Sequence, residues 1–143
     1  MQNVRILGAA ELHHADCAEV LKNIPRPFVV LTDPPYGIGI SKNPIRQAHA
    51  KKDWDAATPA ADVIETLLDL SEHQIIGGGN YFTLPPSQGF LIWDKVQPEG
   101  LTLAQCEYAW MSQQRPAKLF TRRVVGYKKE HPTQKPVALY MHR

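Results

Sequence analysis

The sequence has 143 residues, the usual size of one domain, and 43% of them are hydrophobic, which is enough for a packed core rather than a disordered chain. Its net charge of +2 permits a polyanionic partner but lies below that of most dedicated non-specific DNA binders. Two cysteines exclude a disulfide scaffold, and with no secretory leader or apolar run of membrane length we expect one domain over residues 1–143 of a cytoplasmic protein.

The N-terminal part of the chain predicts a strand–helix–strand unit. Residues 11–16 have the pattern of a strand that ends in an acid, and residues 17–24 are amphipathic, with Asp16 placed as the N-cap. The apolar, β-branched residues 27–32 then predict a buried strand, so the unit indicates a parallel sheet. His13 and the next histidine would point to opposite faces of the first strand, so we expect no metal site there.

The strand at residues 27–32 leads into Asp33-Pro34-Pro35-Tyr36, and the functional prediction depends on this tetrad. Because the two prolines fix the backbone and lack N–H groups, the loop offers acceptors, the Asp33 carboxylate and the Pro34 carbonyl, beside the flat ring of Tyr36. Such a set suits a planar substrate with an amino group, because two acceptors favour a pyramidal and more nucleophilic nitrogen. The alternative is a proline-rich turn in which Asp33 caps a following helix.

A polar, loop-like segment follows at residues 38–59. It carries several cations, Lys42 and Arg46 among them, which either contact phosphates or belong to a solvated loop. Thr58 is expected to open an amphipathic helix over residues 59–73, because apolar residues recur there at helical spacing.

A second buried strand is predicted at residues 74–76, followed by three glycines at 77–79 and then by Asn80 and Tyr81. The glycines lack the Lys-Ser/Thr pair of a nucleotide-binding loop. We expect them instead to let the backbone pass close to a ligand or to a neighbouring segment.

Two further strands are predicted at residues 89–95 and 107–112, with Trp110 in the core. Residues 118–129 alternate apolar and cationic residues and hold the densest positive cluster of the chain, which includes Arg122 and Arg123. This cluster either meets the phosphates of DNA or forms the polar face of an edge strand.

Four sequence motifs occur in the order typical of one enzyme family: Asp33-Pro34-Pro35-Tyr36, Gly78-Gly79-Asn80-Tyr81-Phe82, Trp93-Asp94-Lys95 and His131-Pro132-Thr133-Gln134-Lys135-Pro136. The chain resembles the amino-group DNA methyltransferases that use S-adenosylmethionine, and Asp in the first tetrad position is most similar to adenine-specific, phage-type members whose catalytic half comes first. The resemblance implies an α/β fold: a partial Rossmann-like sheet, mostly parallel with one antiparallel strand, and helices on both faces.

The function implied by the resemblance is methyl transfer to the exocyclic N6 amine of an adenine flipped out of double-stranded DNA, in a bacterial or phage restriction–modification setting. Asp33 and the Pro34 carbonyl would hold the amine, Pro35 would fix the loop and Tyr36 would stack on the base. No metal is implied. Contact with the cofactor is implied for Asp16, Cys17, Thr133 and Lys135. Contact with the substrate or DNA is implied for Asn80, Tyr81, Lys42, Arg46, Arg122 and Arg123.

Simpler roles stay open for several of these residues. Asp16 and Cys17 also fit a helix cap and a buried small residue, and Thr133 and Lys135 also fit a stiff helix entry or support of the catalytic loop. Asn80 and Tyr81 also fit turn formation and core packing.

The family pattern continues with an Asp-Pro-Phe-x-Gly-Ser/Thr-Gly loop that binds the cofactor, whereas this sequence stops at Arg143, inside the helix predicted from residue 137. We therefore expect the chain alone to bind S-adenosylmethionine weakly. We also expect one unpaired, apolar sheet edge, which a second polypeptide or another copy of the chain could cover. Two alternatives to adenine methylation remain. One is methylation of cytosine at its N4 amine, which Asp in place of Ser disfavours, and the other is an inactive remnant that binds DNA or a partner chain.

Overall fold

The computed structural model describes residues 3–39, 55–131 and 133–141. Seven strands are found in these ranges: β1 (Asn3–Leu7), β2 (Ala10–His14), β3 (Val29–Thr32), β4 (His73–Gly77), β5 (Gly89–Asp94), β6 (Cys106–Met111) and β7 (Lys118–Thr121). The helices of the same ranges are α1 (Cys17–Leu21), α2 (Ala61–Leu70), α3 (Val137–Tyr140) and a 3-10 turn, η3 (Gly79–Tyr81). None of these helices is long and apolar enough to cross a membrane.

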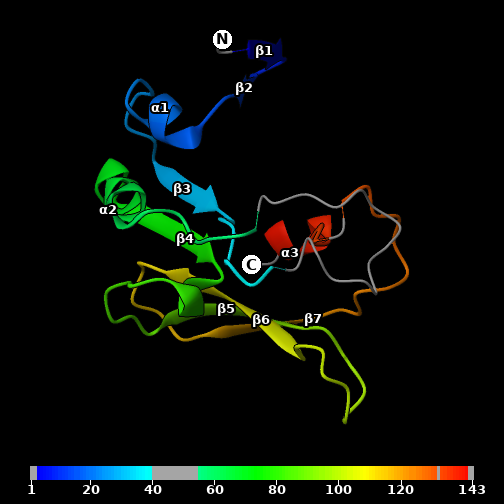
Figure 1. The fold of residues 1–143 in the computed structure, drawn as a ribbon. Helices are drawn as coiled ribbons and strands as arrows, with labels where there is room; N and C mark the ends of the chain where they lie inside the picture. The colour runs from blue at the N-terminus through cyan, green and yellow to red at the C-terminus, as the bar shows by residue number, and fades with distance from the viewer. Residues whose placement is uncertain (1–2, 40–54, 132, 142–143) are drawn as a thin grey trace.

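Five of the strands form one mixed sheet in the order β3-β4-β6-β5-β7 (Figure 1). β3 is parallel to β4 and β5 is parallel to β7, whereas β6 lies between β4 and β5 and is antiparallel to both. β6 is thus the strand of this sheet that runs against the other four. The α/β class is confirmed as a mixed five-stranded sheet with few helices, and a Rossmann-like arrangement stays a prediction.

The strands predicted at residues 74–76, 89–95 and 107–112 are found as β4, β5 and β6. The cationic segment at residues 118–129 begins with β7, which pairs only with β5 among the described strands and so forms an edge of the sheet. The edge position is therefore confirmed, but β7 ends at Thr121, so Arg122 and Arg123 follow the strand and do not form its polar face.

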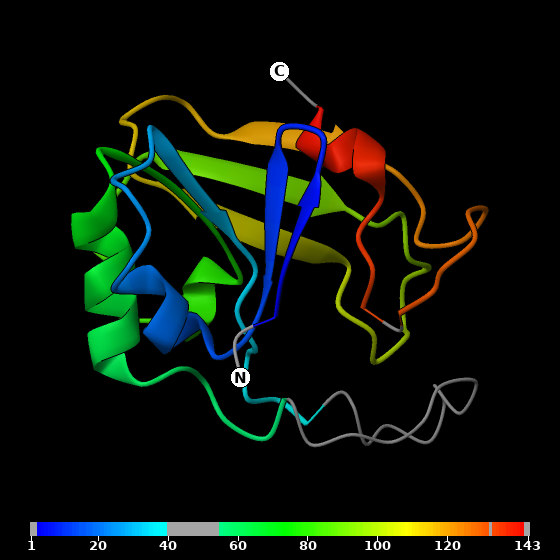
Figure 2. The same ribbon diagram turned by 90° about the horizontal axis from the view of Figure 1, so that it is seen from above.

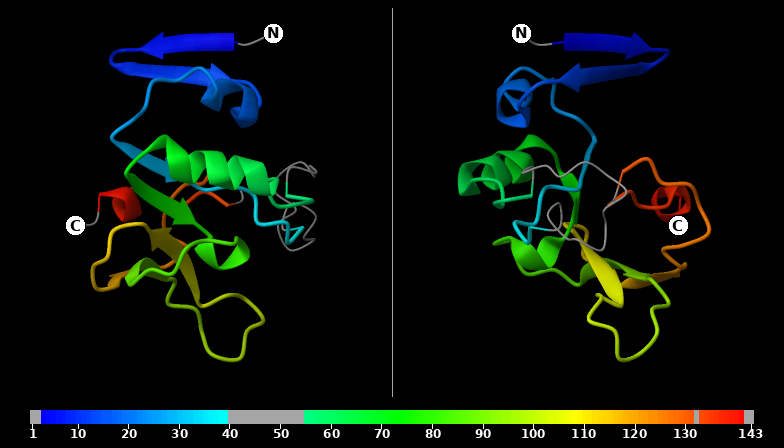
Figure 3. Two further views of the ribbon diagram at one scale, coloured as in Figure 1. Left: turned by 90° about the vertical axis from the view of Figure 1, so that its left-hand side faces the viewer. Right: turned by 45° about the vertical axis from the view of Figure 1, so that its right-hand side comes forward.

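The strand–helix–strand prediction for the N-terminal part is wrong as a unit of a parallel sheet. β2 pairs antiparallel with β1 in a separate two-stranded sheet, which lies apart from the five-stranded sheet in Figures 1 and 3. Leu7 is opposite Ala10, so the hairpin turn contains only two residues, and the first of them is Gly8 at φ +60°. Because this tight turn pairs the two strands locally, the backbone of β2 needs no partner in the larger sheet.

The two longer helical predictions differ in their accuracy. α1 has Asp16 as its N-cap, as expected, and the Asp16 carboxylate accepts a hydrogen bond from the N–H of Ala18 at 2.9 Å. α2 begins at Ala61 rather than at residue 59, and Ala60 is its N-cap without a side-chain bond, so Thr58 does not open it. The helix also ends at Leu70, because His73 already belongs to β4.

The predicted apolar face of α2 packs against one face of the sheet. Ile64 and Leu67 are buried against Val30 of β3, and α1 lies beside α2 (Figure 2). On the other face of the sheet, Leu139 of α3 and Leu31 of β3 line a small cavity of about 110 Å³. Among the described helices, α1 and α2 thus lie on one side of the sheet, and only the four-residue α3 lies on the other.

The interior of the sheet is formed by Ile76 and three large residues, Trp93, Trp110 and Met111. Trp110 is buried, as predicted, and its indole N–H donates to the carbonyl of Pro85 at 2.9 Å. This bond satisfies the one polar group of the ring, so the indole contributes its full apolar area to the core.

β3 forms the other edge of the sheet, because within the described residues it pairs only with β4. Phe28 just before it and Val29 and Leu31 within it are exposed, at 81%, 43% and 53%, so the strand predicted at residues 27–32 is found as β3, but the prediction that it is buried is wrong. The predicted apolar edge is therefore present in the described part of the chain, and the expectation that another chain covers it stays a prediction.

Ile76 tests where the core lies, because its side chain is fully buried. We expect Ile76→Ala to lower the free energy of unfolding by about 2–5 kcal/mol, since the substitution removes buried methyl groups and leaves a cavity. Urea denaturation measures this loss. Ile6→Ala is the matched control, because Ile6 is 72% exposed and should cost less than about 1 kcal/mol. Equal losses in the two variants would contradict the assignment of the core.

Candidate functional site

The Asp-Pro-Pro-Tyr tetrad and the three glycines meet at one edge of the sheet. The tetrad at residues 33–36 follows β3, and the glycines at 77–79 come at the end of β4. β3 and β4 are parallel, with Thr32 opposite Ile76, so their carboxyl ends lie side by side. The tetrad therefore stands at the carboxyl edge of the sheet, as expected from its sequence.

The glycines allow the tetrad to lie directly against the end of β4. A Cβ atom at Gly77 would overlap the carboxylate of Asp33, and one at Gly78 would overlap the ring of Tyr36. Gly78 also has a φ of +67°, which residues with side chains rarely adopt. The prediction that the glycines permit a close approach is confirmed, and the approaching segment is the tetrad itself.

Tyr36 is held at its ring and at its hydroxyl. Its ring stacks on Tyr81 of η3 at a centroid distance of 4.8 Å and an interplanar angle of 15°. Its hydroxyl donates to Oδ1 of Asp33 at 2.6 Å. Burial raises the pKa of the Tyr36 phenol, and the positive charge of Lys135 offsets this rise only in part. The phenol therefore stays neutral near pH 7 and keeps its proton for the bond to Asp33.

Asp55 supports the backbone of the same loop. Its Oδ1 accepts hydrogen bonds from the N–H groups of Tyr36 and Gly37, at 2.8 and 2.9 Å, and the residue is 1% exposed. Two amide donors on one carboxylate oxygen stabilise its buried charge and fix the turn after the tetrad. Sequence reasoning did not select Asp55, because nothing in the sequence shows that it folds back onto a loop 19 residues earlier.

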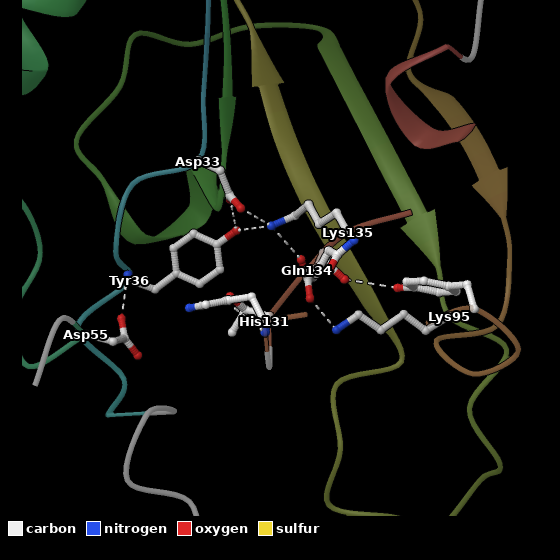
Figure 4. A network of polar contacts seen from close by, with 10 residues as sticks. Asp33, Tyr36, Asp55, Lys95, His131, Gln134 and Lys135 are labelled. Carbon is white, nitrogen blue, oxygen red and sulfur yellow. Dashed lines mark hydrogen bonds and ion pairs between the residues drawn. The ribbon is translucent and has the colours of Figure 1, made fainter. Parts of the chain in front are cut away.

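Lys135 joins the tetrad to the middle of the sheet (Figure 4). Its ammonium lies 2.5 Å from Oδ2 of Asp33, 3.1 Å from the Tyr36 hydroxyl and 3.2 Å from Oε2 of Glu107 on β6. The other oxygen of Glu107 pairs with Lys95 at 2.5 Å. Asp33, Lys135, Glu107 and Lys95 thus form a polar row in which carboxylates and ammonium groups alternate. The four charges sum to zero.

The row changes the pKa values of its members in opposite directions. Burial by itself lowers the pKa of Lys135, but the carboxylates of Glu107 and Asp33 outweigh it and raise the pKa above its ordinary value. Burial likewise raises the pKa of Glu107, but the ammonium groups of Lys135 and Lys95 outweigh it and lower the pKa. Both groups are therefore charged near neutral pH.

A cleft of about 730 Å³ opens beside this row. The four tetrad residues line it together with four other predicted site residues, Asn80, Tyr81, Thr133 and Lys135. Lys95 and Glu107 line it as well, and sequence reasoning missed both as site residues. The signal for Lys95 was its place in Trp93-Asp94-Lys95, at the end of a predicted strand. Glu107 gave no signal, because a single acid in a strand is ordinary.

The remaining predicted residues do not line the cleft. Asp16 caps α1 and Cys17 is exposed at the first position of that helix. Arg122 and Arg123 are exposed just after β7, where the Arg122 guanidinium and the Lys129 ammonium lie 5.7 and 5.1 Å from the centre of the Tyr127 ring. The predicted DNA contacts Lys42 and Arg46 lie outside the described residues.

Comparisons with known proteins identify no relative: no family model, no curated protein and no solved structure matches the chain. The described residues also contain no cluster of three or more histidine, cysteine or acidic side chains that could hold a metal ion.

Gly78→Ala tests whether the tetrad depends on the close approach of its loop to β4. We expect it to lower the free energy of unfolding by about 1–3 kcal/mol more than Gly8→Ala, because only the Cβ at residue 78 meets another group, the ring of Tyr36. Gly8 is the matched control, since its φ of +60° imposes nearly the same backbone strain and its Cβ would meet nothing within 4 Å. Urea denaturation gives the difference, and a tyrosine near-ultraviolet circular dichroism band that stayed unchanged in Gly78→Ala would contradict the ring displacement.

Glu107 gives the site a dependence on pH. Its folded pKa is lowered, so its stabilisation is complete above the ordinary value of 4.5 and is lost as the pH falls through the folded value. Glu107→Gln should lower the free energy of unfolding at about pH 7 by about 1–3 kcal/mol and flatten its decline between about pH 5 and about pH 3. Urea denaturation across that range measures both effects. Glu65→Gln on the exposed side of α2 should keep the wild-type pH profile, and the same profile in Glu107→Gln would show that the row does not contribute.

Proposed function

We propose that the chain is the catalytic portion of a DNA methyltransferase, which transfers a methyl group from S-adenosylmethionine to the exocyclic N6 amine of adenine. The observation that carries the proposal is the position of the tetrad on the wall of a cleft large enough for a base. Its volume of about 730 Å³ falls within the range of roughly 300–1,000 Å³ that is usual for ligand sites.

The groups on this wall suit a planar ring with an amino group. Asp33 offers carboxylate oxygens and Pro34 offers a carbonyl, both of which accept hydrogen bonds from an NH₂ group. Tyr36 and Tyr81, stacked on one another, line the same cleft and give it aromatic surface for a base that has left its duplex. Asn80 adds an amide that can donate to or accept from a base edge.

Only some of the residues implied for the cofactor line the cleft. Thr133 and Lys135 line the cleft beside the tetrad, but Asp16 and Cys17 lie on α1 and do not. The ammonium of Lys135 is also already paired with two carboxylates. The four residues implied to contact S-adenosylmethionine are therefore not all brought together at the cleft. We propose this cofactor from the four sequence motifs.

The charge distribution is compatible with a nucleic acid at the mouth of the cleft. Lys129 lines the cleft and shares the Tyr127 ring with Arg122. Cations at this position would contact phosphates and add affinity that does not depend on sequence. We propose double-stranded DNA as the partner on this basis and on the resemblance.

Asp33→Ala tests the proposed role of the carboxylate. The purified chain is incubated with double-stranded DNA and S-adenosylmethionine that carries a labelled methyl group, and the methylated nucleosides are identified by mass spectrometry. We expect N6-methyladenine from the wild type and a rate at least about 100-fold lower from Asp33→Ala, because one of the two acceptors for the amine is lost. Asp69→Ala, on the exposed side of α2, should match the wild type.

The other outcomes separate the alternatives. N4-methylcytosine as the product would replace the adenine assignment with the cytosine one. Absence of saturable binding of labelled S-adenosylmethionine, with and without DNA, would favour an inactive remnant. Unchanged methyl transfer by Asp33→Ala would remove the carboxylate from the mechanism.

A further inference from the structure

Lys135 contacts more of the site than any other described side chain in the polar row. Its ammonium pairs with Asp33 and with Glu107 and lies within 3.1 Å of the Tyr36 hydroxyl, although it is 99 residues from Tyr36 in the sequence. The side chain is 9% exposed, so these contacts replace most of its hydration. Figure 4 shows its ammonium directed at Asp33 and at the hydroxyl of Tyr36.

We propose that Lys135 is a positioning residue, which holds the Asp33 carboxylate in the orientation that receives the substrate amine, and that Glu107 holds Lys135 in place. This inference rests on the proposed methyltransferase function. It assigns to Lys135 a role other than contact with the cofactor.

The geometry at Asp33 explains why an anchor is needed. Oδ2 accepts from Lys135 and Oδ1 accepts from Tyr36, so both ends of the carboxylate are fixed. A carboxylate oxygen has room for about two hydrogen bonds, so each oxygen keeps one acceptor position for an amine. Without Lys135 the side chain would be held only by Tyr36 and could rotate about its bond to the backbone.

A role of Lys135 in proton transfer is disfavoured by its surroundings. Glu107 and Asp33 outweigh the effect of burial and raise the pKa of Lys135, so the ammonium is protonated at neutral pH and has no lone pair to accept a proton. The side chain therefore acts as a fixed positive charge with three donors. Its three polar contacts, with Asp33, Tyr36 and Glu107, match these three donors.

Glu107 determines where this positive charge lies. Its position on β6, a central strand of the sheet, makes it a rigid anchor, and Lys95 neutralises its second oxygen. The Lys95 ammonium in turn lies 5.5 Å from the centre of the Trp93 ring, which is buried in the sheet. The orientation of Asp33 is thus tied to the core through Lys135, Glu107 and Lys95.

Steady-state kinetics of methyl transfer to double-stranded DNA test the inference. We expect Lys135→Met to lower kcat by about 100-fold, because misplacement of a reacting group by about 1 Å has that effect, and to leave KM for DNA within about twofold. Lys135→Arg keeps the positive charge and should lie within about tenfold of the wild type. Lys22→Met is the matched control, since Lys22 also pairs with a glutamate but is exposed on the surface, and it should behave as the wild type.

If Lys135→Met does not fold, Glu107→Gln tests the same positioning role, and crystal structures of the variants report the orientation of the Asp33 carboxylate. Glu107→Gln preserves the shape of the anchor and should lower kcat by about tenfold with little change in KM. The crystal structure of Lys135→Met should show the Asp33 carboxylate rotated from its wild-type orientation, and that of Glu107→Gln should show the Lys135 ammonium displaced from Asp33. A wild-type kcat in folded Lys135→Met, or an unmoved Asp33 in its structure, would overturn the inference and leave the proposed function standing. A wild-type chain that transfers no methyl group, with the full polar row present in its structure, would overturn the proposed function and the positioning role with it.

Discussion

The nearly buried ammonium of Lys135 is the interaction on which the arrangement of the site depends. A buried charge without partners costs several kcal/mol, so the chain must bring carboxylates to it or the segment around it cannot dock. Asp33 from the end of β3 and Glu107 from β6 supply these carboxylates. Three segments that are distant in the sequence therefore meet at one point, and the wall of the cleft is built where they meet.

The tetrad reaches that point only because the neighbouring strand end lacks side chains. Gly77 and Gly78 leave the space that the Asp33 carboxylate and the Tyr36 ring fill, and the Asp55 carboxylate then fixes the backbone after them. Rigidity from prolines, space from glycines and a buried acceptor thus act on the same few residues. Side chains arranged in this way are oriented before a ligand arrives, which is the condition for electrostatic stabilisation of a reaction.

The sequence was sufficient to predict the parts that depend on local patterns. The apolar runs of β4, β5 and β6, the Asp16 cap of α1 and the position of the tetrad after a strand all follow from spacing along the chain. The placement of β6 between β4 and β5 was not predictable, nor was the separate β1–β2 hairpin, because strand order depends on which distant segments pair. The contacts of Asp55 and Glu107 were missed for the same reason: hydrogen bonds and ion pairs between distant segments leave no periodic signal in the sequence.

The position of the site also has a consequence for β3, which has a strand neighbour on one side only among the described residues. At its amino end, the Ser71 hydroxyl donates a hydrogen bond to the carbonyl of Phe28. In its middle, Val30 packs under α2. At its carboxyl end, which carries the tetrad, Asp33 forms an ion pair with Lys135. Edge strands are the least protected strands of a sheet and tend to open locally. The polar row therefore has two effects that cannot be separated in the folded protein, because the same ion pair that orients Asp33 also closes the end of the strand that presents it.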